Sequence, residues 1–264
     1  HRLFRRQRQM CIRDRLHDNC TVPLNDFLMD QTLAPSEPFG MDDYVPAYLS
    51  LFKMDDQIVA LPFAGETVFL TYRKDLFDEK GLEAPKTWDE FLSHAKQLKT
   101  DDVAAVVMRI GRGWEFTYMW SIFIYPFGGD MVDLETNTAQ IDNAGNAASL
   151  EYLRQLLPYG PVGFENYHWD TSMTAIMEGK AAMSVEASAL AGEYENPDKS
   201  RTAGKLAYAP LPTGPSGAYS GVWGWGLGVK KTSKNQEAAI AAIAYFTSKA
   251  KHQAYVNAGG PVSR

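Results

Sequence analysis

Two carboxylates occupy positions from which they could bind the hydroxyl groups of a ligand. Glu66 follows Gly65 at the join of two extended runs, and Glu186 follows the apolar run 181–185, which predicts a short buried strand. A side chain at the carboxyl end of a strand opens onto the crevice where α/β proteins bind ligands. Both carboxylates are therefore candidate ligand contacts. The alternative for Glu186 is a partner in a surface ion pair.

A donor-rich segment lies between a predicted buried strand over 103–110 and a predicted helix over 117–125. Arginine presents a fork of N–H donors that can grip vicinal hydroxyls or a carboxylate. The alternative is a solvated loop with one anchoring Trp. The residues that make this segment a candidate site are Arg109, Arg112, Trp114 and Tyr118. Glu115 lies in the same segment.

Two indole rings two residues apart predict a flat apolar platform. Period-two alternation along a strand over 223–229 puts Trp223 and Trp225 on one face and three glycines on the other. The glycine face lets another backbone approach closely, while the indoles either pack in the core or line the edge of a cleft. The glycines lack the GxGxxG spacing of a dinucleotide loop, and the following lysines come too late for a phosphate loop.

The sequence offers little for catalysis. The five histidines are scattered without zinc-type pairing, and no GxSxG motif occurs. Glu66 and Glu186 could also be the acid pair of a glycoside hydrolase, which stays open as the enzymatic alternative. We otherwise expect a protein that is not an enzyme and that needs neither a cofactor nor a metal.

Composition argues against several classes of function. A net charge of −6 disfavours general nucleic-acid binding, and no apolar run approaches the roughly 20 residues of a membrane span. Residues 1–15 carry six Arg and one acidic residue, and they lack the apolar core of a signal peptide. They resemble translated adapter sequence, so we expect a non-native segment. Cys11 and Cys20 lie near this end, and a disulfide between the two stays open as an alternative, although no sequence pattern supports it.

Strands alternate with helices along the rest of the chain, which predicts the α/β class. We expect strand over 57–72 with a break at Gly65. A helix should begin at Thr87, whose hydroxyl forms a capping box with Glu90. Apolar residues at helical spacing predict another helix over 144–157.

Two further helices are expected towards the carboxyl end. Residues 171–177 predict a helix that Gly179 ends. Ser233 is expected to cap the last helix, with Gln236 completing a second capping box. The apolar residues that this last helix should bury are Ile240, Ile243 and Phe246.

Seven short motifs follow one another between residues 22 and 262. The first three are Asp43-Tyr44-Val45-Pro46-Ala47-Tyr48, the run from Ala60-Leu61-Pro62-Phe63 to Tyr72-Arg73-Lys74-Asp75-Leu76-Phe77, and Pro85-Lys86-Thr87-Trp88-Asp89-Glu90-Phe91. The other four are Phe127-Gly128-Gly129-Asp130, Glu178-Gly179-Lys180-Ala181-Ala182-Met183, Ala209-Pro210-Leu211-Pro212, and Trp225-Gly226-Leu227-Gly228-Val229 with the helix after it. Each motif alone is weak, but in this order the seven resemble the bacterial extracellular solute-binding proteins, the carbohydrate-type receptors of ABC importers.

The resemblance implies an α/β fold of the periplasmic-binding-protein-like II type. Two lobes would be joined by crossing strands, with the ligand in the cleft between them. Residues 16–65 and 222–264 would be parts of lobe one, and residues 66–221 would form lobe two. The resemblance also implies that lobe one is incomplete and that the chain is a fragment of a longer protein.

The resemblance further implies the capture subunit of a bacterial importer for a sugar, an oligosaccharide or a polyol. Many relatives carry a Trp soon after the strand at 181–185, and this chain has none there. Glu186 and the doubled Trp223 and Trp225 look more like the sorbitol- and mannitol-type receptors. The implied partners are the ligand and the transmembrane permease subunits, with no nucleic acid. We expect a monomer, located in the periplasm or outside the cell on a lipid anchor.

The same resemblance gives each candidate residue a role. Indole rings would cover the C–H faces of the ligand, and charged side chains would bond its hydroxyls. The rings are Trp114, Trp223 and Trp225, the charged groups are Glu66, Arg109, Arg112 and Glu186, and Tyr118 belongs to the same candidate site. A lectin-like module that binds carbohydrate without transport is the remaining alternative.

Overall fold

The computed structural model describes residues 20–29, 41–54, 56–133 and 135–264. The candidate non-native segment 1–15 and Cys11 therefore lie outside the described residues. The chain divides into two compact units. Unit 1 comprises the residues up to Glu66 together with Val222–Arg264, and unit 2 comprises Thr67–Gly221. Strand β3 (Leu61–Arg73) runs without interruption across the boundary between the two units at Glu66 and Thr67.

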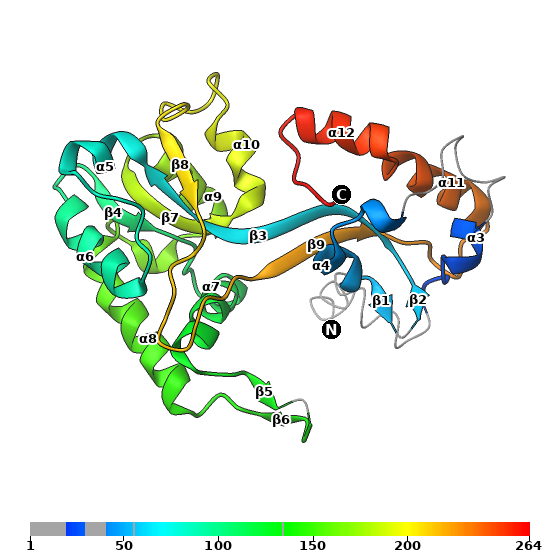
Figure 1. The fold of residues 1–264 in the computed structure, drawn as a ribbon, viewed down its shortest axis with the longest axis horizontal. Coiled ribbons are helices and arrows are strands. Elements are labelled where there is room, and N and C mark those ends of the chain that lie inside the picture. The colour runs from blue at the N-terminus through cyan, green and yellow to red at the C-terminus, as the bar shows by residue number, and fades with distance from the viewer. Residues whose placement is uncertain (1–19, 30–40, 55, 134) are drawn as a thin grey trace. The chain divides into compact units, whose positions relative to one another are not determined.

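Unit 2 is built on a mixed sheet with the strand order β4-β7-β3-β8 (Figure 1). Strand β7 (Ala181–Ala187) runs parallel to β4 (Ala104–Val107) and antiparallel to β3. Strand β8 (Leu206–Ala209) pairs antiparallel with the other edge of β3. Every residue of β4 and β7 is buried, because helices and loops cover both faces of the sheet, as is usual where parallel pairing occurs.

Helices surround this sheet. Helix α6 packs on β4, α9 packs on β7, and α7 packs on α8. The helices of unit 2 are α5 (Lys74–Lys80), α6 (Trp88–Leu98), α7 (Trp114–Ile124), α8 (Ala144–Leu156), α9 (Trp169–Met177) and α10 (Ala191–Tyr194). Short elements join them: η2 (Tyr125–Phe127), β5 (Val132–Asp133), β6 (Thr138–Ala139), η3 (Leu157–Tyr159), η4 (Phe164–Asn166) and η5 (Ser188–Leu190).

An aromatic cluster ties three of these helices together. The ring of Trp88 in α6 lies 4.6 Å from that of Phe123 in α7 and 5.7 Å from that of Tyr152 in α8. The Tyr152 hydroxyl donates to the Trp88 carbonyl oxygen at 2.6 Å. Burial raises the pKa of this hydroxyl well above its ordinary value, so Tyr152 stays a neutral donor. The cluster fixes the helix α7, which carries part of the candidate site.

Unit 1 gathers segments that are far apart in the sequence. Its core consists of Leu24, Leu61, Val229, Ile240 and Ile243. Its elements are α3 (Asn25–Met29), η1 (Met41–Asp43), α4 (Pro46–Ser50), β1 (Lys53–Met54), β2 (Gln57–Ile58), the first part of β3, β9 (Val222–Leu227), α11 (Gln236–Phe246) and α12 (Lys249–Asn257). Strand β9 pairs with β3.

The predicted helices and strands are largely present, which confirms the α/β class. The capping residue Thr87 accepts a hydrogen bond from the Glu90 backbone N–H at 3.1 Å. The Glu90 carboxylate accepts from Lys86 rather than from Thr87, so the reciprocal half of the capping box is shifted by one residue. Gly179 follows Glu178, the C-cap residue of α9, and has a positive φ of 73°, which is the left-handed conformation that ends helices.

Predictions that depended on single local residues are wrong at Gly65 and Ser233. Gly65 does not break the strand, since β3 continues through it and its N–H bonds to the carbonyl oxygen of Val262. Ser233 does not cap α11. Its hydroxyl accepts from the N–H of Asn235, the N-cap residue.

The last predicted helix is in fact two helices, α11 and α12. On α11, Ile240 and Ile243 are buried as expected, but Phe246 is exposed. Helix α11 has apolar residues on all sides, and Phe246 lies on a side that does not face the core.

We expect Thr87→Ala to destabilise unit 2 by about 1 kcal/mol, because it removes the hydroxyl that caps α6. Urea denaturation followed by circular dichroism measures the change. Thr87→Ser keeps the oxygen and is the matched control. Equal stability of the alanine and serine variants would show that the cap does not contribute.

We also expect the stability of unit 1 to fall as the pH drops below about 6.5. Burial lowers the pKa of His252 from its ordinary value of 6.5, Arg264 acts in the same direction, and Asp43 opposes both. The neutral imidazole accepts from the Ser263 N–H at 3.0 Å. Because the unfolded chain takes up this proton first, the stabilisation is complete above pH 6.5 and is lost as the pH falls.

Thermal melts between pH 7.5 and pH 5 test this expectation. His252→Gln retains a hydrogen-bond acceptor but does not titrate, so its melting temperature should depend less on pH. A wild-type profile as flat as that of the glutamine variant would contradict the assignment.

Candidate ligand-binding site

A buried ion pair forms the centre of the candidate site in unit 2. The Arg109 guanidinium lies two residues beyond β4 and meets the Glu186 carboxylate in β7. Nε donates to both carboxylate oxygens, at 3.1 and 2.9 Å, and Nη2 donates to Oε2. The Arg109 backbone N–H donates to Oε1, and the Ala187 N–H donates to Oε2. Glu186 therefore holds both the side chain and the backbone of Arg109.

The two charges depend on each other. Burial by itself would lower the pKa of Arg109, but the hydrogen bonds and charge of Glu186 outweigh it and raise that pKa. Burial raises the pKa of Glu186, while the guanidinium and the two backbone N–H groups oppose this rise. Each charge therefore offsets the cost of burying the other, and removal of either partner would leave a buried charge without its main counter-charge.

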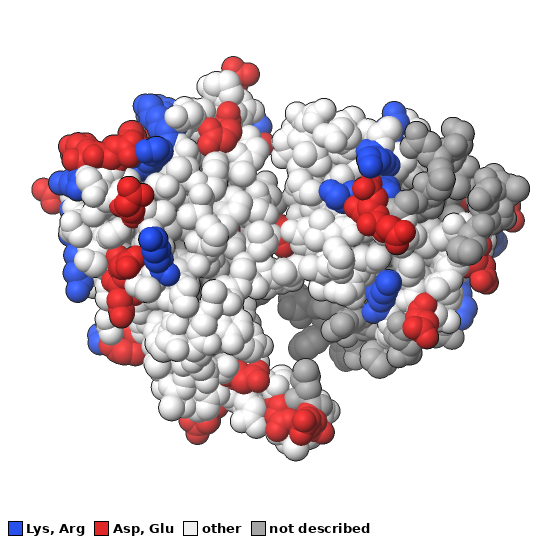
Figure 2. Space-filling view, in the orientation of Figure 1, with Lys and Arg blue, Asp and Glu red and all other residues white. Residues whose placement is uncertain are grey.

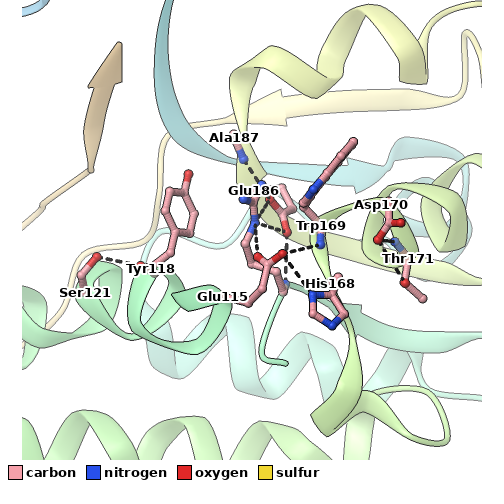
Figure 3. Close-up of polar contacts among 10 residues, drawn as sticks. Glu115, Tyr118, Ser121, His168, Trp169, Asp170, Thr171, Glu186 and Ala187 are labelled. Atoms are coloured by element: carbon pink, nitrogen blue, oxygen red, sulfur yellow. Dashed lines mark hydrogen bonds and ion pairs between the residues drawn. The ribbon is translucent and has the colours of Figure 1, made fainter. Parts of the chain in front are cut away.

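A second carboxylate completes the charge cluster, as Figure 3 shows. Glu115, in the first turn of α7, is buried and places Oε2 3.7 Å from Arg109 Nε. Its Oε1 lies 3.3 Å from Nδ1 of His168 and accepts from the Trp169 backbone N–H at 3.4 Å. One guanidinium thus lies between two carboxylates, and the cluster leaves little positive charge uncompensated.

Aromatic rings flank the guanidinium. The Arg109 Cζ atom is 4.4 Å from the ring centroid of Tyr118 and 5.9 Å from that of Trp114, distances at which cation–π attraction is appreciable. Trp114 is the first residue of α7, and 60% of its surface is exposed. Four of the predicted site residues therefore meet in unit 2: Arg109, Trp114, Tyr118 and Glu186. Arg112, in the turn before α7, is exposed.

The other predicted site residues lie in unit 1. Trp225 on β9 is 59% exposed, and Trp223 is half-buried. The glycine face of β9 is closely packed, mainly against side chains rather than the predicted backbone: a Cβ on Gly224 would lie 3.2 Å from the Leu51 side chain, and one on Gly226 would overlap the Phe52 ring. At Gly228 the nearest neighbour is a backbone atom, the Val59 carbonyl oxygen. Glu66 is the last residue of unit 1 and is half-buried. Its negative charge adds to burial in raising the pKa of Tyr48.

The sequence prediction passed over three residues of the cluster. Glu115 was noted in its loop but given no role, and His168 and Trp169 were assigned to no site. The prediction started α9 at residue 171, whereas the helix begins at Trp169. The sequence signal for Trp169 was weak, because its exposure and its place in the first turn of α9 are known only from the structure.

The surface and the metal chemistry of the described residues are simple. Acidic and basic side chains are interspersed on the face shown in Figure 2. The residues that the structure describes contain no cluster of His, Cys, Asp and Glu that could hold a metal. Within the same residues, no helix is both long and apolar enough to cross a bilayer.

Comparison with known proteins defines the class of the chain. Residues 20–253 match the family model of the bacterial extracellular solute-binding proteins. The chain is 28% identical over 221 residues to the mannitol-binding protein of Pseudomonas aeruginosa, covering 80% of this chain and 50% of that protein. It is 25% identical over 215 residues to a protein of Sinorhizobium fredii named a probable amino-acid ABC transporter periplasmic-binding protein, covering 79% and 48%.

A solved structure agrees with these sequence matches. The ribitol complex of an ABC transporter solute-binding protein from Agrobacterium radiobacter K84 superposes with a TM-score of 0.86 and 27% identity, covering 95% of this chain and 63% of that one. The chain belongs to the bacterial extracellular solute-binding protein family, and the predicted periplasmic-binding-protein-like fold class is confirmed. The chain spans about half the length of the two curated relatives.

We expect Glu186→Gln to destabilise unit 2 by about 3 kcal/mol, because it leaves a buried guanidinium without its main counter-charge. The double variant Arg109→Met, Glu186→Leu should be closer to wild type in its free energy of unfolding, since it removes both charges. Urea denaturation compares the three proteins. Asp78→Asn, which breaks an exposed Lys74 pair, is the control and should leave the midpoint nearly unchanged. A glutamine variant as stable as that control would contradict the role of the buried pair.

Proposed function

We propose that this chain is part of the capture protein of a bacterial ABC importer and that it binds a polyol or a sugar. The observation that carries the proposal is the Arg109–Glu186 pair with the rings of Trp114 and Tyr118 beside it. Glu186 is fully buried and makes its hydrogen bonds within the cluster, where it fixes Arg109. The Arg109 guanidinium keeps a small exposed part and is a charged donor of the kind that bonds hydroxyls strongly, and aromatic faces cover C–H groups. This combination suits a ligand that carries both on every carbon.

The compensated charge of the cluster favours a neutral ligand. An amino acid would bring a carboxylate, which needs a free cation, whereas Arg109 already faces the carboxylates of Glu186 and Glu115. The relative named for mannitol and the relative solved in complex with ribitol support the same choice. We therefore propose a neutral hydroxylated solute in preference to the amino acid in the name of the Sinorhizobium relative.

The glycosidase alternative has less support. A general acid or nucleophile must reach the glycosidic bond, but the Glu186 carboxylate is fully buried and is held by Arg109 and the Ala187 N–H. No contact of the described residues favours the lectin-like alternative over capture for transport.

We propose that side chains of both units contact the ligand, that a monomer delivers it to transmembrane permease subunits, and that the protein works in the periplasm or on a lipid anchor outside the cell. Binding that requires both units would draw on Trp223, Trp225 and Glu66 of unit 1 as well as on the Arg109 cluster.

We expect Trp225→Ala to weaken the binding of D-mannitol or ribitol about tenfold, because the exposed indole would no longer cover C–H groups of the ligand. A tenfold loss corresponds to about 1.4 kcal/mol, within the range for an aromatic contact. Titration calorimetry of the purified chain measures the affinity, and Trp225→Phe should lose less than the alanine variant.

Phe246→Ala is the control, because it removes a ring of similar exposure from α11 in the same unit. A Trp225→Ala affinity equal to wild type would remove unit 1 from the site. A wild-type chain that binds neither polyols nor sugars would overturn the proposed function itself.

A further inference from the structure

The carboxylate of Glu115 caps a helix to which it does not belong. Helix α9 has His168 at its N-cap position, and no side-chain bond is made there by His168 itself. Instead the first N–H of the helix, that of Trp169, donates to Glu115 Oε1 of α7. A negative charge at a helix N-terminus is favourable, so Glu115 joins the beginnings of α7 and α9.

The backbone reinforces this junction. The N–H groups of Ile110 and Gly111 both donate to the Tyr167 carbonyl oxygen, at 3.1 and 2.8 Å. A Cβ on Gly111 would lie 3.0 Å from that oxygen, so the close approach depends on glycine. The segment that carries Arg109 is thereby fixed against the residues that precede Trp169.

The backbone of Trp169 is therefore held at the charge cluster by its own bond to Glu115 and by the bonds that fix Tyr167, two residues before it. Its ring extends away from the carboxylate that its own N–H contacts (Figure 3). The residue is 41% exposed, and no other described residue hydrogen-bonds to its indole N–H. An exposed indole offers an apolar face and one N–H donor, the two features that a hydroxylated carbon chain can use.

We propose that Trp169 is a further ligand-contacting residue of unit 2, and that Glu115 is the residue that positions it. This inference rests on the proposed function, because it assigns the indole to the same neutral hydroxylated ligand. Trp114 and Trp169 are the first residues of two helices whose starts meet at the Arg109 cluster. A ligand at this cluster is then contacted by indoles from both helices. The two indoles, together with the charged groups, set the preference among polyols.

Fluorine NMR of the full chain, with 5-fluorotryptophan at all six Trp positions, tests the proposal. Trp169→Phe identifies the resonance of Trp169 by its disappearance. D-mannitol and ribitol are the probes, added at rising concentration, and calorimetry measures their affinity for the wild type, Trp169→Ala and Trp169→Phe. Phe246→Ala is the control for loss of an exposed ring.

We expect either polyol to shift the Trp169 resonance in a saturable way. Trp169→Ala should weaken binding at least tenfold, Trp169→Phe less than that, and Phe246→Ala not measurably. Circular dichroism and the melting temperature show whether each variant is folded. Glu115→Gln should weaken binding less than Trp169→Ala and should shift the Trp169 resonance of the free protein, because the capped N–H then faces a neutral amide oxygen in place of a carboxylate.

Two results would overturn the inference in different ways. A wild type that binds a polyol, with an unmoved Trp169 resonance and full affinity in folded Trp169→Ala, rejects the role of Trp169 and leaves the proposed function intact. A wild type that binds no polyol and no sugar overturns both.

Discussion

The arrangement of unit 2 around its candidate site depends on one buried arginine. Arg109 has lost nearly all contact with water, and such a charge is stable only beside fixed counter-charges. Glu186 supplies the first from the centre of the sheet, and Glu115 supplies the second from the start of a helix. The requirement to neutralise one guanidinium thus fixes the positions of β7, α7 and the segment after β4 relative to one another.

Aromatic side chains take positions that this charge cluster leaves open to solvent. Tyr118 packs beside the guanidinium, while the two Trp residues at the starts of α7 and α9 remain exposed. Aromatic rings that stabilise a core are usually buried. The aromatic residues that do stabilise unit 2 are elsewhere, in the buried cluster of Trp88, Phe123 and Tyr152.

Much of this fold could be predicted because local signals and tertiary packing agree. The cap at Thr87 and the helix over Ala144–Leu156 are examples. The prediction failed where a long-range contact decides the outcome. Gly65 looks like a break in isolation, but its backbone pairs with a residue almost two hundred positions away. The sequence identified Arg109 and Glu186 as site candidates, but only the structure shows that they bind each other. No local pattern could place Glu115 at the start of a helix that begins more than fifty residues later.

Strand β9 has two faces with different tolerance for change. On one side, Gly226 lies against the Phe52 ring without room for a methyl group, and Gly224 is tightly packed against Leu51. On the other, Trp225 is open to solvent. A library that randomises this strand in a search for new ligand preferences would accept diversity at the ring positions and reject it at the glycines. Along this one strand, positions that packing holds constant alternate with positions that directed evolution can vary.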